Sequence, residues 1–305
     1  RNPTDPRLSS LLQEKFHQAG LVAASKPDEP VADKESIVRL LVERHAPLET
    51  RSKEGGFTPL LTAAYHGEAV VVKVLLDLGA DITARDKAGF TALHSAAEQN
   101  FPAVVQLLLA HGADLNALTG DGRTVLGTAM GIHSGTVVEI LLKAGANPDT
   151  PSSGLTPLAI AAQRGQPGNI ALLLRHHANP NIPSRAGIMP VSFASQGPKE
   201  ALRNQADSQA KQVSDSSDYL VTNLGNEEDY LECIRLLVDA GAEVLPGKSL
   251  QNSPLHAAAF GDFEAAARLL LDRPVARARP CHAQRGASLP RLSAAEHAAR
   301  LFGHA

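Results

Sequence analysis

One segment of the sequence fits a pattern that carries phosphate chemistry in other proteins. The residues AEVLPGKS, from Ala242 to Ser249, match the loose form [AG]-x4-G-K-[ST] of a phosphate-binding loop. Such a loop needs a strand before it and a helix after it, so that backbone N–H groups and a helix N-terminus face the phosphates. Here the helical pattern IRLLVDAG precedes the segment and the polar turn LQNSP follows it. Because both flanks are wrong, we expect no nucleotide site.

Histidines are the other candidates for catalysis or metal binding. His176 and His177 are adjacent, and adjacent residues on a helix point in different directions. No Cys, His or Asp stands at ligand spacing from them, and His133-Ser134 does not form a nucleophile–base pattern. We interpret the His pair as a helix C-terminus, where His suits the helix dipole. The sequence therefore predicts no metal, no cofactor and no catalytic residues.

A repeat of 32 or 33 residues dominates the middle of the chain. Gly56, Gly89, Gly122, Gly154 and Gly187 are spaced 33, 33, 32 and 33 residues apart. They open segments such as GFTPLLTAAYHGEAVVVKVLLDLGAD and GFTALHSAAEQNFPAVVQLLLAHGAD. A fixed period of this size is typical of stacked repeats, which usually present a surface rather than enclose a reaction.

Each repeat has the signals of two helices. Thr58 is a candidate helix N-cap, and Pro59 follows at the first helical position, where its missing N–H costs nothing. A second helix then carries apolar residues at positions i, i+1, i+4 and i+5 of residues 71–76, which form one wide stripe. Gly79 suits the left-handed conformation after that helix. No repeat can bury its stripe alone, so several must stack around a shared core.

The recurring pattern G-x-T-P-L…A-A…V-V-x-x-L-L-x-x-G-A-D resembles ankyrin repeats. The resemblance covers roughly residues 34–272 and implies an all-α solenoid of about six to seven stacked helix-turn-helix units with inter-repeat β-turn loops. It also implies a concave face made of turn tips and first helices. The array is divergent: the His after Thr-Pro-Leu survives only at His94 and His256, and Asn100 replaces the usual inter-helix Gly. We therefore expect uneven local stability.

Composition changes mark the ends of the array and one interruption. We interpret residues 1–33 as a degenerate N-terminal cap and linker, and residues 34–272 as the ankyrin array. In the sixth unit the second helix arrives late, which predicts a polar insert at about residues 198–228. We expect a solvated loop there, with a phosphorylation site in its SDSSDY run as the alternative. Residues 273–305 form an Arg/Pro/Ala-rich segment with the pattern of a capping helix near its end.

Composition also restricts the classes of partner. The 305 residues are 43% hydrophobic and 20% charged with a net charge of −3, which is typical of a soluble globular protein. There is no basic surplus to pair with nucleic acid, and no apolar run approaches the ~20 residues of a membrane span. Two cysteines and the absence of N-x-S/T sites predict an intracellular protein, cytoplasmic and/or nuclear. We also expect a monomer.

By the resemblance, a protein partner contacts the turn tips and the exposed side of each first helix. Phe57, Phe90, Arg123, Leu155 and Ile188 hold one equivalent position in successive repeats and should form a stripe along the concave side. Aromatic and Arg side chains are the usual anchors of interfaces, although Phe at this position can instead cover a neighbouring turn. The predicted partner-binding residues are Phe57, Tyr65, His66, Phe90, Glu98, Gln99, Arg123, Leu155 and Arg164.

Function follows from the same resemblance. Asn116 stands where many ankyrin repeats carry Asn, which implies a hydroxylation site; the alternative is an Asn that bonds the turn backbone. The leading hypothesis is a non-enzymatic scaffold or adaptor that binds a partner protein of unknown identity on its concave surface. The second is the ankyrin targeting region of a larger enzyme or channel, because the sequence begins at Arg1 rather than at Met.

Overall fold

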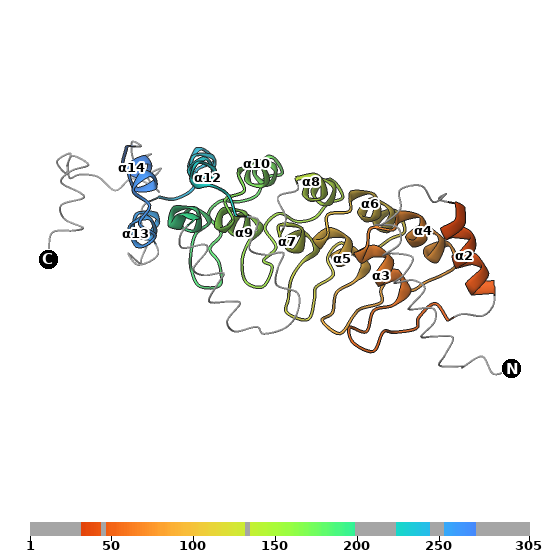
Figure 1. The fold of residues 1–305 in the computed structure, drawn as a ribbon. Helices are drawn as coiled ribbons and strands as arrows, with labels where there is room; N and C mark the ends of the chain where they lie inside the picture. The colour runs from red at the N-terminus through yellow and green to blue at the C-terminus, as the bar shows by residue number, and fades with distance from the viewer. Residues whose placement is uncertain (1–31, 44–46, 132–134, 199–223, 245–252, 273–305) are drawn as a thin grey trace, which may run out of the picture.

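Pairs of short helices, stacked in a row, make up the part of the chain that the structure describes (Figure 1). The structure is a computed structural model that describes residues 32–43, 47–131, 135–198, 224–244 and 253–272. The first helices of the pairs are α3 (Pro59–Tyr65), α5 (Ala92–Glu98), α7 (Val125–Ala129), α9 (Pro157–Gln163), residues 190–198 and α13 (Pro254–Phe260). The second helices are α2 (Ala32–Glu43), α4 (Ala69–Asp77), α6 (Pro102–Ala110), α8 (Gly135–Lys143), α10 (Pro167–Arg175), α12 (Glu227–Asp239) and α14 (Glu264–Asp272).

The helices form two layers. The second helices pack against one another in the order α2 to α14 and form the upper layer in Figure 1, and the first helices form the layer below. At the N-terminal end, Lys34 Nζ on α2 lies 3.0 Å from Glu68 Oε2 in the turn before α4, which fastens α2 to the array. The described residues contain no strand longer than an isolated β-bridge. The predicted all-α solenoid is therefore confirmed.

A continuous apolar core lies between the layers. Leu75, Leu108 and Leu141, from α4, α6 and α8, are each 0% exposed and belong to one buried cluster. The predicted stripe of each second helix therefore faces its neighbours rather than water. Burying one Leu side chain contributes about 1.5–3 kcal/mol. Because this burial depends on the adjacent units, the stack stabilises each hairpin.

Helix ends follow the signals in the sequence. Before α3, α5, α7, α9 and α13 a hydroxyl oxygen accepts a hydrogen bond from the backbone N–H three residues later; the residues are Thr58, Thr91, Thr124, Thr156 and Ser253. After the second helices the backbone turns left-handed, with φ of +87° at Gly79, +82° at Gly112 and +98° at Gly145. His177 takes the same place after α10 with φ +65°. The pattern of N-caps and C-terminal turns predicted from the repeats is confirmed at these positions.

Hydrogen bonds between backbones also join neighbouring turns. The N–H groups of Lys87, Gly120, Ser153 and Arg185 donate to the carbonyl oxygens of Gly55, Ala88, Gly122 and Gly154 at 3.0, 2.8, 2.9 and 2.8 Å. One such bond recurs in each of these successive units. The bonds hold the turn tips in a row below the first helices, where the loops project in Figure 1.

The stack continues across the position of the predicted insert. Residue 198 is helical and α12 begins at Glu227, so helices enter the range 198–228 from both sides. Tyr230 of α12 covers Gly165, where an added Cβ would lie 2.6 Å from the Tyr230 ring. In an uninterrupted unit Phe101 covers Gly67 in the same way, at 2.5 Å. The predicted insert core (199–223), N-terminal cap (1–31) and C-terminal segment (273–305) lie outside the described residues.

Candidate partner-binding surface

An aromatic cluster lies at the N-terminal end of the predicted surface. Phe57, just before α3, is half-buried, packs against the core and lies over Gly55, where an added Cβ would overlap its ring. Its ring centroid is 6.3 Å from that of Tyr65, at the end of α3. Tyr65 is 37% exposed and meets the His66 ring edge-on at 5.3 Å. Phe57 therefore covers a turn, and Tyr65 and His66 present the exposed part of the cluster.

The next unit places Phe90 against a buried histidine. The Phe90 ring centroid is 5.7 Å from that of His94, which is 0% exposed. His94 Nδ1 lies 2.9 Å from Thr91 Oγ1, and Nε2 lies 3.4 Å from the carbonyl oxygen of Arg123. Desolvation lowers the pKa of His94 to about 4, so the ring is neutral at pH 7. His94 joins α5 to the turn before α7 and packs against the Phe90 ring.

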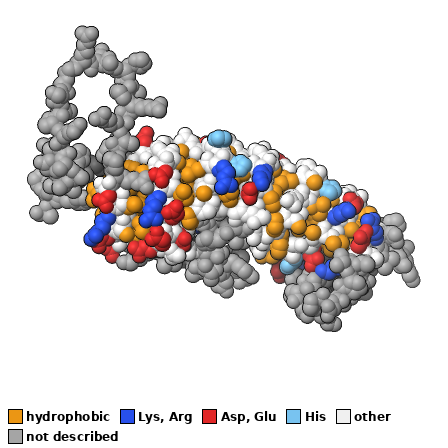
Figure 2. All heavy atoms as spheres, turned by 90° about the horizontal axis from the view of Figure 1, so that it is seen from above, with side chains coloured by type: hydrophobic (Ala, Val, Ile, Leu, Met, Phe, Trp, Pro, Cys, Tyr) orange, Lys and Arg blue, Asp and Glu red, His pale blue; other side chains and the backbone are white. Residues whose placement is uncertain are grey.

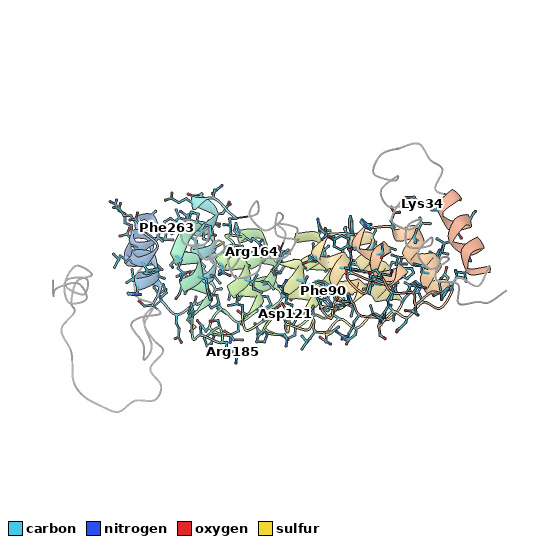
Figure 3. The ribbon with its side chains drawn as sticks, turned by 60° about the horizontal axis from the view of Figure 1, so that its bottom comes forward. Lys34, Phe90, Asp121, Arg164, Arg185 and Phe263 are labelled. Atoms are coloured by element: carbon cyan, nitrogen blue, oxygen red, sulfur yellow. The ribbon has the colours of Figure 1, made fainter. Side chains whose placement is uncertain are left out.

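Charged residues follow at the next turn. The Asp121 carboxylate accepts a hydrogen bond from Arg123 Nε at 2.8 Å and another from the Thr119 hydroxyl. Desolvation opposes ionisation of Asp121, but the Thr119 hydrogen bond and the Arg123 guanidinium outweigh it and lower the pKa of Asp121. Arg123 is therefore already paired within its own turn. In Figure 3, Phe90, Asp121 and Arg164 follow one another along the array, and Arg185 lies lower, among the turn loops.

Glu98 and Arg164 are half-buried charged residues, and the groups around them do not offset the cost of removing their charges from water. Desolvation raises the pKa of Glu98; Arg123 opposes the shift, and Asp86 and Asp121 add to it. Arg164 donates from Nη1 to the carbonyl oxygen of Gly131 at 2.9 Å, and desolvation lowers its pKa. Within the described ranges, Glu98 accepts no hydrogen bond and Arg164 forms no ion pair.

One exposed aromatic residue escaped the sequence reasoning. The residue seven positions after the N-cap is equivalent in every repeat, and we call these positions the helix-end row because α3, α5, α9 and α13 end there; the row comprises Tyr65, Glu98, Gly131, Gln163, Gln196 and Phe260. Phe260, the last of them, is 62% exposed. Aligning NSPLHAAAFGD with GFTPLLTAAYHG places Phe260 on Tyr65, so the repeat register contained the signal.

The remaining predicted residues are spread along the same units. Gln99 is the half-buried C-cap of α5, while Leu155 and Ile188 are half-buried against the core. Asn116 is exposed in the turn after α6, where its backbone N–H donates to Asp114 Oδ1 at 2.9 Å. The structure therefore places the five residues of the predicted stripe before successive first helices, but as partly packed side chains.

The segments first singled out for chemistry gain no support. The segment AEVLPGKS follows helix α12 rather than a strand, and residues 245–252 lie outside the described part, as do His133 and Ser134. Cys233 is buried, and desolvation raises the pKa of its thiol. Among the residues placed by the structure, no three His, Cys, Asp or Glu side chains form a group that could hold a metal ion.

The opposite face differs from this surface. Seen from above, the layer of second helices mixes apolar, basic and acidic side chains, with acidic ones most frequent towards α12 and α14 (Figure 2). Several of its charges are exposed pairs within one helix, such as Glu139 with Lys143 at 2.8 Å and Glu264 with Arg268. No helix in the described ranges combines the length and apolar character needed to cross a bilayer.

Solved structures with the same architecture are ankyrin repeat domains. The ankyrin repeat domain of Bcl-3, described as a unique member of the IkappaB protein family, is 26% identical with a TM-score of 0.58 and covers 77% of this chain and 91% of that one. An ankyrin repeat domain from Acinetobacter baumannii AYE is 25% identical with a TM-score of 0.52, and the match covers 70% of this chain and 96% of that one.

Sequence comparisons agree with the structural ones. Ankyrin repeat and SAM domain-containing protein 6 of Rattus norvegicus is 47% identical over 51 residues, which are 17% of this chain and 6% of that protein. An ankyrin repeat and KH domain-containing protein of Caenorhabditis briggsae is 43% identical over 51 residues, 17% of this chain and 2% of that protein. The chain thus spans a small part of the length of these relatives. A family model that describes three copies of the ankyrin repeat matches residues 22–119 and again residues 111–184. The chain therefore belongs to the ankyrin repeat family.

Proposed function

We propose that this protein is a non-enzymatic scaffold or adaptor that binds a partner protein on the concave side of its ankyrin array. Ankyrin repeats are generally protein–protein interaction modules, and their domains are typically non-catalytic. The observation that carries the proposal is the cluster of Phe57, Tyr65 and His66, which exposes an aromatic edge beside half-buried charges in the next units. Exposed aromatic and Arg side chains are the groups that most often anchor interfaces.

The stack supplies the mechanism of binding. Buried leucines such as Leu75 and Leu108 fix the helices, and hydrogen bonds between turns fix the tips. A surface that is ordered before binding loses little conformational entropy when the partner docks. The chain would therefore bind by presenting side chains at fixed intervals along the array.

The test uses exposed or half-buried residues that lie outside the buried core. We would combine Tyr65→Ala, His66→Ala and Gln99→Ala and leave Phe57 intact because it covers Gly55. The matched control combines Lys73→Ala, Gln106→Ala and Lys143→Ala, which are exposed on the second helices. Affinity capture with mass spectrometry should show that the first variant loses its partners and the control keeps them, while both melt close to the parent. Equal capture by the two variants would exclude this surface.

The alternative function is the ankyrin targeting region of a larger enzyme or channel. It is favoured by the relatives whose names combine ankyrin repeats with a second domain, and of which the matched segments are 6% and 2%. Sequencing the complete transcript tests it. An open reading frame with a catalytic or channel domain beside the array would support the alternative, and a frame limited to the array would rule it out.

The proposal further takes the chain to act as an intracellular monomer, in the cytoplasm and/or nucleus, without binding nucleic acid. It is supported by the net charge of −3 and by the free, buried thiol of Cys233, which suits a reducing compartment. Asn116 is proposed as a hydroxylation site, supported by its exposure in the turn after α6. Light scattering after size exclusion tests the monomer, and intact-mass analysis of protein purified from cells tests for one added oxygen.

A further inference from the structure

Two opposite charges on the predicted surface are left without a full partner by the fold. Glu98 ends α5 and Arg164 follows α9, so they lie in units separated by one unit, that of α7. In the helix-end row the position between Glu98 and Gln163, the residue before Arg164, is Gly131. Arg164 Nη1 donates to the Gly131 carbonyl oxygen at 2.9 Å, so the guanidinium lies against the unit of α7, which also adjoins the unit of Glu98.

Glu98 is half-buried among charges of both signs. Arg123 favours its ionised form, whereas burial, Asp86 and Asp121 oppose it, and Arg123 is itself bonded to Asp121 at 2.8 Å. No hydrogen bond from the described residues reaches the Glu98 carboxylate. A half-buried carboxylate without donors carries a desolvation cost. A cationic side chain supplied from outside would offset that cost.

Arg164 is the complementary case. A guanidinium has five N–H donors, and a single hydrogen bond, to Gly131, joins this one to the described residues. The phenol of Tyr230 donates to the Gln163 carbonyl oxygen at 2.8 Å, so it packs nearby without neutralising the charge. A carboxylate could accept two parallel hydrogen bonds from such a guanidinium.

We propose that the concave surface binds a protein segment that places a Lys or Arg side chain against Glu98 and an Asp or Glu side chain against Arg164. The inference rests on the proposed function and specifies the chemistry of its partner. Charge complementarity favours a protein segment, because a nucleic acid would bring phosphates towards Asp86, Glu98 and Asp121. Each contact is a charge-assisted hydrogen bond in a partly desolvated site, the kind that contributes most to specificity.

A display library of short random peptides, selected on the full chain, tests the inference. The variants are Glu98→Gln and Arg164→Gln, and the matched controls are Glu139→Gln and Lys143→Gln, an exposed ion pair of α8 on the other layer. Tyr65→Ala identifies the selected peptides that bind the concave surface. Those peptides should carry both a basic and an acidic residue. Glu98→Gln and Arg164→Gln should each lower the affinity for these peptides about tenfold or more, while the control variants leave it unchanged.

Charge exchange then assigns the pairs. Replacing the acidic residue of a selected peptide by Lys should abolish binding to the parent chain and restore it to the Arg164→Glu variant. If peptides need Tyr65 for binding but show no preference for charged residues, or bind both charge variants as well as the parent, the inference is wrong and the proposed function stands. If the selected peptides bind the Tyr65→Ala variant and both charge variants as well as the parent, the inference and the proposed function are both wrong. Circular dichroism of each variant excludes unfolding as the cause of a loss.

Discussion

The unit α5–α6 and the unit α7–α8 fill the same position with different chemistry. In the first, His94 sits inside α5, and the backbone N–H of the N-cap Thr91 donates to its ring at 3.4 Å. In the second, Gly127 takes the place of the histidine, and Ser152 from the following turn fills the space. The Ser152 hydroxyl accepts from the N–H of Thr124 at 3.1 Å.

The comparison shows that the buried N–H of the N-cap residue needs a hydrogen-bond acceptor, and that different residues can supply this acceptor. A buried N–H without a partner costs about 1–3 kcal/mol. In the unit α5–α6 the acceptor for the N-cap N–H is a side chain of the same unit, whereas in α7–α8 it is a hydroxyl of the next unit. The unit α7–α8 should therefore depend more on its C-terminal neighbour than α5–α6 does.

The largest expected effect comes from the shared core, where the two units are equal. Leu108→Ala in α6 and Leu141→Ala in α8 remove side chains that are both 0% exposed. Each should lower the free energy of unfolding by about 2–5 kcal/mol, since a buried cavity forms. Urea unfolding followed by circular dichroism measures this. The control Leu118→Ala, at a residue 48% exposed, should change it by less than ~0.5 kcal/mol. A Leu141→Ala cost no larger than the control's would show that α8 is not packed as described.

The next effect separates backbone strain from packing between units. Gly67 and Gly79 both have positive φ, +74° and +87°, so Ala at either position costs about 1 kcal/mol. At Gly67 the added methyl also meets the Phe101 ring at 2.5 Å, whereas nothing lies within 4 Å at Gly79. Gly67→Ala should therefore destabilise by about 2–4 kcal/mol in thermal or urea unfolding. Equal costs for the two variants would mean that the aromatic contact does not constrain the stack.

Acid should weaken the α5–α6 unit and spare α7–α8. The pKa of His94 lies near 4 in the folded protein, below its ordinary 6.5, so the unfolded chain takes up the proton first. This stability is fully present above pH 6.5 and is lost as the pH falls towards 4, by about 2 kcal/mol at pH 5. Hydrogen exchange should show faster opening of α5 than of α7. His94→Leu, which installs the residue that α3 has at Leu61, should remove this part of the pH dependence.

The smallest expected effect concerns the Ser152 hydroxyl, which accepts the hydrogen bond from the N–H of Thr124. Ser152→Ala leaves the N–H of Thr124 without its acceptor and should cost about 1 kcal/mol. The exchange rate of the Thr124 amide, followed by NMR, should rise about fivefold. The control Thr136→Ala removes an exposed side chain of α8 and should leave that amide unchanged. Protection that persists in Ser152→Ala would show that Ser152 is not the acceptor in solution.

Much of the fold could be predicted because its signals are local and repeated. Thr58 followed by Pro59 indicates the start of a helix, and Gly79, with its left-handed backbone, indicates the end of the next one. The contact of Ser152 with Gly127 could not be found this way, because it joins two units and replaces a residue that the pattern lacks. Sequence spacing likewise placed Phe57 and Tyr65 on the candidate surface, but it could not show that Phe57 folds back over Gly55.

The contact of Tyr230 with Gly165 has a practical consequence for engineering. Residue 198 is helical and α12 begins at Glu227, and Tyr230 of α12 covers Gly165 as Phe101 covers Gly67, so α12 packs on the preceding unit as an uninterrupted unit does. Lengthening a connection of this kind costs little, because closure entropy grows only with the logarithm of loop length. A fluorescent domain grafted between residues 198 and 224 would report on the protein in living cells while its ankyrin units remain assembled.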